Sequence, residues 1–165
     1  MSAVSDIALI ALFILIGGTF AAAEMALVTL RESQIRQLAA KGKRGRAIER
    51  LTSDPNRFLS AVQIGVTLSG FLSASFGESS IAPYIVPVVE GWGVPKSVAA
   101  PLTTIVLTLI ISYCSIVISE LVPKRIAMQR NEQIARAVVP AIHVFAKVCK
   151  PIIWLIGKNT NGIVR

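Results

Sequence analysis

The sequence has little of what most enzymes and metal-binding domains are built from. Its two cysteines, Cys114 and Cys149, lie far apart and make no CxxC or zinc-ligand spacing, so neither a disulfide framework nor a zinc site is expected. It has no glycine-rich phosphate loop, HExxH motif or Ser-His-Asp set. Aromatic residues make up only 6% of the chain and do not interleave the basic segments, which disfavours nucleic-acid binding. We therefore expect a protein that is not an enzyme and does not bind nucleic acid.

Acidic residues are also scarce, whereas apolar residues are abundant. Nine Asp and Glu stand against 17 Lys and Arg, while 53% of the residues are hydrophobic and the mean hydropathy is +0.66. The apolar residues gather in three stretches, about 7–30, 58–81 and 98–122. At a helical rise of about 1.5 Å per residue, each stretch can cross a hydrocarbon core about 30 Å thick. The sequence therefore predicts an all-α membrane protein with three transmembrane helices.

The distribution of positive charge predicts the orientation of these helices. The segment 31–57 and the segment 124–165 carry eight Lys and Arg each, whereas the segment 82–97 has only Lys96. The positive-inside rule then places the N-terminus outside and the C-terminus in the cytoplasm. The first stretch is not expected to be a cleaved signal peptide, because no Lys or Arg precedes it and its apolar run continues past the alanines. We expect a multi-pass protein of the cell membrane.

The segments between the stretches have patterns of their own. Segment 31–57 is basic, with apolar residues at helical spacing, and predicts a cytoplasmic helical hairpin that is broken at residues 41–45. Segment 82–97 contains three prolines and a Gly-Trp-Gly group, which are typical of a structured external loop. Both predictions assume the orientation given by the positive-inside rule, with segment 31–57 in the cytoplasm and segment 82–97 outside.

The region after the third stretch, about 124–156, is ambiguous. Its polar side chains recur three or four residues apart and fall on one stripe of a helical wheel, opposite an apolar face. This pattern favours a juxtamembrane belt, with an amphipathic helix lying in the inner membrane interface and its cations near anionic headgroups. The alternative is a fourth spanning helix, which would bury two lysines near its middle. The stripe consists of Arg136, Pro140, His143, Lys147 and Lys150, and the face opposite consists of Val138, Ala141, Ile142, Phe145 and Val148.

Two carboxylates lie near the inner ends of the apolar stretches, where each costs at least about 2.5 kcal/mol and needs a compensating partner. Glu24 and Glu120 each lie within seven residues of the basic segment that follows. Helical rise therefore places both in one layer, about 6–11 Å from the inner membrane boundary. Gln63 and Thr67 of the second stretch reach a similar depth on one helical face. These side chains predict a cation site near the cytoplasmic surface.

Pro123 strengthens this prediction. It has no N–H group, so it leaves the carbonyl of Ser119 without its helical partner, one residue from Glu120. Hard cations prefer carboxylate, carbonyl, hydroxyl and amide oxygens, and broken helices at membrane depth commonly line ion sites. Ser115 shares a helical face with Ser119. Its hydroxyl fits two roles that the sequence does not separate, namely ion binding and close helix packing.

Three motifs, in this order, resemble the cyclin-M/CorC family of magnesium transport proteins. The run FAAAEMAL (Phe20–Leu27) is similar to the family's first-helix motif. The run QIGVTL (Gln63–Leu68) is similar to the second-helix segment of its hemolysin-like branch. The run SELVPKRIA (Ser119–Ala127) is similar to the signature that closes the third membrane helix. The resemblance covers essentially the whole chain.

The resemblance implies a homodimeric domain with three transmembrane helices and a juxtamembrane belt. It also implies export of Mg²⁺, coupled to inward movement of Na⁺, and a full-length protein with regulatory CBS modules that these 165 residues do not contain. The residues that carry the site are then the metal ligands Glu120, Ser119, Glu24, Gln63 and Thr67, supported by Pro123, Lys124, Gly65 and Ser115.

The chain departs from the family pattern at positions that supply oxygen atoms. Ala21 and Ala23 stand where the family has a serine before the first-helix glutamate. Val66, Thr67 and Gly70 stand after the second-helix glycine, where the family has asparagines. An ion that needs six oxygen ligands would therefore lack several of the side-chain oxygens that the family pattern supplies. Two alternatives to Mg²⁺ export follow. One is export of polyamines such as putrescine or cadaverine, and the other is a membrane sensor or scaffold without transport.

Overall fold

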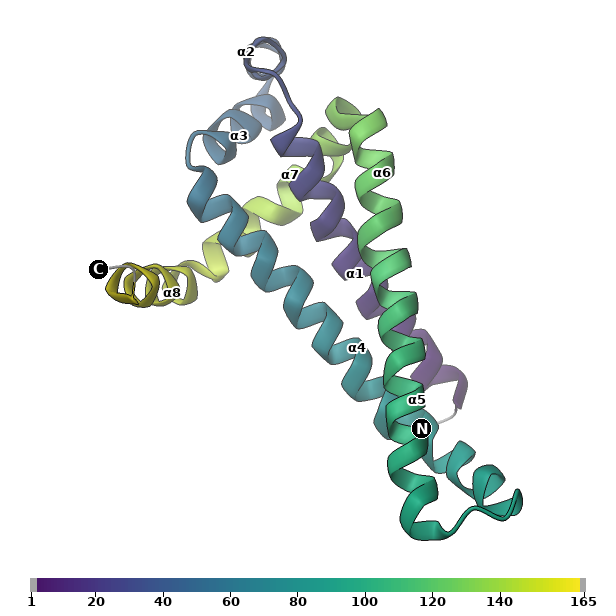
Figure 1. The fold of residues 1–165 in the computed structure, drawn as a ribbon. Helices are drawn as coiled ribbons and strands as arrows, with labels where there is room; N and C mark the ends of the chain where they lie inside the picture. Colours follow the sequence, from purple (N-terminus) through teal and green to yellow (C-terminus); the bar gives the residue numbers. More distant parts are fainter. Residues whose placement is uncertain (1–2, 164–165) are drawn as a thin grey trace.

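Figure 1 shows the computed structural model, which describes residues 3–163. Within this range every regular element is a helix, and three helices are long and apolar enough to cross a membrane. They are α1 (Ala3–Val28), α4 (Pro55–Gly91) and a continuous helix made of α5 (Lys96–Ser115), a π-helical segment η1 (Ile116–Leu121) and α6 (Val122–Gln129). The all-α fold class and the three predicted spans are confirmed.

The two ends of this bundle differ in what they carry (Figure 1). One end carries α2 (Glu32–Ala40), α3 (Lys43–Thr52) and α7 (Asn131–Val148), and we call it the basic end. The other, which we call the loop end, carries the short connection 92–95 between α4 and α5. The main hydrophobic core lies at the basic end, where α1, α4 and α7 meet the α2–α3 hairpin. Its largest fully buried side chains are Ile48, Ile142, Val62 and Val139.

The helix α4 is longer than the sequence analysis predicted. We expected it to end near residue 81 and to be followed by a loop, but it continues to Gly91 with Pro83 and Pro87 inside it. Its 37 residues span about 55 Å at the usual helical rise, well beyond a hydrocarbon core of about 30 Å. Each proline removes only one helical hydrogen bond. Water can satisfy the freed carbonyls where a helix of this length projects beyond the lipid. The predicted loop therefore shrinks to the connection 92–95.

The third span is also continuous where a break was expected. Instead of ending near residue 122, the helix accommodates Pro123 by widening into the π-helical segment η1 and then continues to Gln129. The Val122 N–H donates to the carbonyl of Val117, five residues back. A π-segment of this kind is one way for a helix to absorb a proline without unwinding. The predicted belt therefore begins at α7, not at residue 124.

The helical hairpin between the first two spans is present. Its break is at Gly42, whose φ of +137° is a backbone conformation that other residues rarely adopt. Gly45, by contrast, lies inside α3 directly against α2. A Cβ at Gly45 would lie 1.6 Å from the carbonyl oxygen of Leu38. The hairpin therefore depends on one glycine for its turn and on another for its close packing.

The region that was ambiguous in the sequence forms two helices instead of one. The helices α7 and α8 (Lys150–Ile163) are bent by 68° relative to each other, so a single straight helix through 134–156 is ruled out. The predicted polar stripe is divided between α7 and Lys150 at the start of α8, and all of its residues are exposed. The predicted apolar face divides, because Ala141 and Val148 are exposed while Ile142 is buried. The face that packs on the core consists of Ala135, Val139, Ile142 and Ala146. An in-plane position for α7 stays a prediction.

Candidate functional site

Two carboxylates from different spanning helices meet at one lysine near the basic end. The Lys124 Nζ atom of α6 lies 3.0 Å from the Glu120 Oε1 atom of η1 and 3.3 Å from the Glu24 Oε2 atom of α1. The side chains are partly exposed, by 26% for Lys124, 29% for Glu24 and 40% for Glu120. The predicted layer of two carboxylates is thus present, and its direct partner is a lysine to which the sequence analysis gave only a supporting role. We call Glu24, Glu120 and Lys124 the ion triad.

Close packing of α1 against η1 and α6 brings the triad together. A Cβ at Gly18 would lie 3.2 Å from the Pro123 ring, and a Cβ at Gly17 would lie 3.2 Å from the Ser119 hydroxyl oxygen. Small residues at these positions therefore let the helices approach closely, as is common in membrane bundles. Because Glu120 and Lys124 are four residues apart on one helix, they face α1 together. Glu24 lies on α1 two turns beyond the glycines and reaches the same lysine.

The serines of the third span fit a role in helix packing as well as a role in ion binding. Ser119 is only 9% exposed, and its hydroxyl faces Gly17 of α1. The Ser115 hydroxyl is buried and has no hydrogen-bond partner among residues 3–163. A buried hydroxyl without a partner is costly in a membrane protein. The Ser115 hydroxyl therefore has unused hydrogen-bonding capacity, and its role as a support of the site stays a prediction.

Gln63 and Thr67 do not join the ion triad in this structure. Both are exposed, and the Gln63 Nε2 atom donates to Thr67 Oγ1 at 3.4 Å. Gly65 between them faces the opposite way, and a Cβ there would lie 2.6 Å from the Phe20 ring of α1. Residues two positions from Gly65 point about 200° away from it. Helical rise predicted the depth of Gln63 and Thr67 along α4, but it did not predict the direction in which their side chains point around the helix axis.

The acidic groups alone do not make a multidentate metal site. Among residues 3–163, no group of three or more His, Cys, Asp and Glu side chains lies close enough to hold a metal ion. The triad supplies two carboxylates, and its neighbours Ala21 and Ala23 add no side-chain oxygen. What the geometry does supply is a place where two carboxylates hold one ammonium group.

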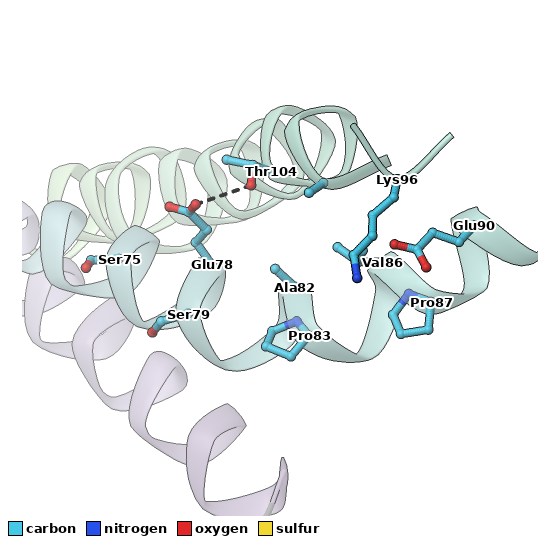
Figure 2. Close-up of a pocket in the computed structure, with 11 residues that line it drawn as sticks. Ser75, Glu78, Ser79, Ala82, Pro83, Val86, Pro87, Glu90, Lys96 and Thr104 are labelled. Carbon is cyan, nitrogen blue, oxygen red and sulfur yellow. Dashed lines mark hydrogen bonds between the residues drawn. The ribbon is translucent and has the colours of Figure 1, made fainter. Parts of the chain in front are cut away.

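A second polar region, which the sequence analysis missed, lies at the loop end. Figure 2 shows Glu78 of α4 at one side of a cavity between α4 and α5, and Glu90 and Lys96 at the other side. The cavity has a volume of about 610 Å³. The Glu78 Oε1 atom accepts a hydrogen bond from Thr104 Oγ1 at 3.3 Å. The signal for this region was Glu78 inside an apolar stretch, but reading residues 82–97 as a loop concealed Glu90.

Comparison with known proteins identifies the family. The model of the cyclin M transmembrane N-terminal domain matches residues 7–165, nearly the whole chain. This chain belongs to the cyclin M transmembrane-domain family. The ion triad of this cyclin M domain lies inside the matched region, as do both motifs that contain its carboxylates.

Three relatives illustrate the range of the cyclin M family. The UPF0053 protein sll0260 of Synechocystis is 37% identical over 153 residues, which cover 92% of this chain and 34% of the relative. The UPF0053 protein YhdT of Bacillus subtilis is 31% identical over 166 residues, covering 100% of this chain and 35% of the relative. A protein of Haemophilus influenzae named polyamine export protein is 30% identical over 160 residues, covering 96% and 37%. The chain thus spans about a third of the length of these relatives.

Proposed function

We propose that this cyclin M domain is the membrane part of a cation exporter and not an enzyme, and that Glu24 and Glu120 bind the transported cation. The observation that carries the proposal is the ion triad, in which carboxylates of two spanning helices lie 3.0 and 3.3 Å from one ammonium nitrogen. Carboxylates at membrane depth are costly and are typical of ion pathways. A pair of them on separate helices can bind a cation and can also respond to relative movement of the helices.

In this proposal Lys124 is the counter-ion of the empty site. Two carboxylates so close together repel each other and need a positive charge in every state of the transport cycle. The flexible stem of lysine lets its ammonium leave when another cation arrives and return when that cation departs. The site is then never left with two unpaired carboxylates. Loading and release become an exchange of one positive group for another.

The geometry favours an organic ammonium ion, such as a polyamine, as the substrate. The pair already holds an ammonium group, whereas Mg²⁺ prefers six oxygen ligands in near-octahedral arrangement. The amide of Gln63 and the hydroxyl of Thr67 point away from the pair. The name of the Haemophilus influenzae relative supports the same substrate class. We propose export from the cytoplasm, with the basic end inside, as the positive-inside rule suggests.

Mg²⁺ export, with Na⁺ as the coupling ion, is the second candidate. It is supported by the motifs around Glu24 and Glu120 and by the presence of two carboxylates in one layer. A homodimer is part of both candidates. The exposed polar face of α4 that carries Gln63 and Thr67 is poorly suited to lipid, which supports a second copy as its cover.

Flux in proteoliposomes tests these proposals. We expect labelled putrescine to enter vesicles that contain the protein, and the rate to fall about tenfold or more in Glu120→Gln, as for the loss of a charge-assisted contact of about 1.4 kcal/mol or more. Glu49→Gln changes an exposed acid of α3 and should leave the rate unchanged. Flux of Mg²⁺ alone, with the same sensitivity to Glu120→Gln, would replace the first candidate by the second. No flux of either cation would leave the sensor or scaffold alternative.

A further inference from the structure

Cations from four helices converge on one cavity at the basic end. The cavity has a volume of about 460 Å³ and lies between the α3–α4 connection and the α7–α8 connection. Arg50 of α3, Arg57 of α4, Lys147 of α7 and Lys150 of α8 line it. The sequence placed these residues in two separate basic segments, the hairpin and the final stripe. The fold joins the two segments at a single site, which we call the basic cavity.

Within the described residues, the cations of the basic cavity form no ion pair with an acidic side chain. None of the ion pairs within residues 3–163 includes Arg50, Arg57, Lys147 or Lys150. The cavity contains one carboxylate, Asp54, but its Oδ1 atom caps α4 by accepting a hydrogen bond from the Arg57 N–H at 3.3 Å. The cavity therefore has four cations and only one carboxylate, and that carboxylate already accepts a hydrogen bond from the N-terminus of α4. Such an excess of positive charge in a concave site attracts an anion.

Part of the lining of the basic cavity is apolar, and we call this part the apolar base. It includes Phe58, which is 3% exposed, and Ala146, which is 4% exposed. Phe58 is also the first residue of the apolar stretch of α4. Because the predicted second span begins at this residue, the expected level of the cavity is the boundary between lipid headgroups and hydrocarbon. An anion with an apolar part can therefore make both charged and apolar contacts here.

The helix α8 supports a position at the lipid boundary. It has 14 residues, which span about 21 Å and are too few to cross the membrane. Trp154 is 64% exposed and Leu155 is 53% exposed, while Lys158 lies over the Trp154 ring at 5.2 Å. Exposed tryptophan and lysine together are typical of helices at the membrane interface. Because α8 begins at Lys150, the basic cavity opens beside such a helix.

We propose that the basic cavity binds the phosphate group of an anionic phospholipid. Arg and Lys side chains from different helices surround the phosphate, and the apolar base contacts the adjoining part of the lipid. Basic pockets between helices on the side of the positive segments are suited to this ligand. The inference goes beyond the proposed function, because no residue of the ion triad lines this cavity. A free phosphate has the same charge chemistry but gains nothing from the apolar base.

Native mass spectrometry of the purified chain tests this inference. The protein is equilibrated with mixed micelles of phosphatidylglycerol and phosphatidylcholine, and the retained lipids are counted. We expect selective retention of phosphatidylglycerol, reduced about fivefold for each cation removed in Arg57→Gln and Lys147→Gln, since each cation near a surface contributes about 1 kcal/mol. The matched control is Arg125→Gln with Arg130→Gln, which removes two exposed cations at the same end that do not line the cavity.

The outcomes separate the possibilities. Loss of phosphatidylglycerol in the cavity variants but not in the control pair supports the inference, and so does its recovery in Lys147→Arg. Equal loss in both pairs would mean general attraction by surface charge and would overturn it. Protection of the protein against heat by inorganic phosphate as strong as that by phosphatidylglycerol would assign the cavity to a soluble anion, which also overturns it. Circular dichroism shows whether each variant has kept its helices.

Discussion

A set of two carboxylates and one lysine lies near each end of the bundle, and the two sets are organised differently. At the basic end, Lys124 contacts Glu24 and Glu120 at 3.3 and 3.0 Å. At the loop end, Lys96 shares a cavity with two glutamates, Glu78 and Glu90, but forms no ion pair with either one in the described chain. The residue types are the same. The difference lies in the packing around them.

The basic end is organised because its helices are held at close range. Glycines on α1 allow contact with the third span, and the core beneath the hairpin is buried almost completely. At the loop end, α4 and α5 separate around the cavity of about 610 Å³. Close packing holds charged side chains at fixed distances from one another, whereas charged side chains in an open cavity can be hydrated instead. This difference fits the proposed cation site at the basic end and predicts a hydrated vestibule at the loop end.

The largest effect is expected for alanine substitution at the glycine between the hairpin helices. Gly45→Ala places a Cβ against the Leu38 carbonyl, where backbone and not a flexible side chain must move. We expect a loss of about 3 kcal/mol or more in hairpin stability, at the upper end for overpacking. Limited trypsin digestion should then cut rapidly at Lys41 and Lys43. Gly91→Ala at the loop end, with open space around it, should digest as slowly as the unchanged protein.

A core deletion at the basic end should be the next most damaging change. Ile48 is 0% exposed, so Ile48→Ala removes buried methyl groups and leaves a cavity, which costs about 2–5 kcal/mol. Ile105→Ala removes the same groups from a side chain that is 59% exposed, and we expect a much smaller change. The midpoint of thermal unfolding in detergent compares the two variants. Equal shifts would contradict the claim that the basic end holds the fold together.

Substitution of one glutamate at each end of the bundle should distinguish a loss of cation binding from a weaker attraction of cations to the protein. We expect Glu120→Gln to lower cation flux about tenfold or more, because it breaks the pair that holds the cation. Glu90→Gln should lower flux less than about threefold, because a carboxylate in an open cavity acts mainly by attracting cations. Initial rates at low and high ionic strength provide the check. Only the effect of Glu90→Gln should disappear in high salt, where exposed charges are screened.

The smallest effect is expected at the hydrogen bond between α4 and α5. Thr104→Val removes the 3.3 Å contact to Glu78 and keeps the shape of the side chain, so we expect a loss of about 1 kcal/mol or less. The change should appear as slightly faster amide hydrogen exchange in residues 78–91, with no change in α2 and α3. Faster exchange at the hairpin as well would mean that the two ends are coupled, which our comparison does not predict.

The sequence predicted the features that depend on composition and periodicity. Three apolar stretches became three spanning helices, Gly42 became the hairpin break, and Glu24 and Glu120 came to one layer. Each of these follows from helical rise, from glycine's backbone freedom or from charge distribution, which are local properties. The family resemblance from three motifs was confirmed by the match over residues 7–165.

What the sequence could not predict depends on direction and on neighbours. The depth of Gln63 was estimated from helical rise, but its direction around α4 is set by the contact of Gly65 with Phe20. The prolines of α4 looked like helix ends because their effect depends on whether water can reach the freed carbonyls. Lys124 looked like a flanking residue because nothing in its own helix shows that Glu24 lies beside it. The basic cavity likewise required the fold to join two segments distant in sequence.

The most direct test of the central claim is the affinity of the purified protein for putrescine, measured by isothermal titration calorimetry in the unchanged chain and in Lys124→Met. If Lys124 occupies the cation site between Glu24 and Glu120, its removal eliminates a competitor, and putrescine should bind about tenfold more tightly, with Lys124→Arg close to the unchanged protein. An affinity that is unchanged or lower in a Lys124→Met protein that keeps its helices would contradict the account.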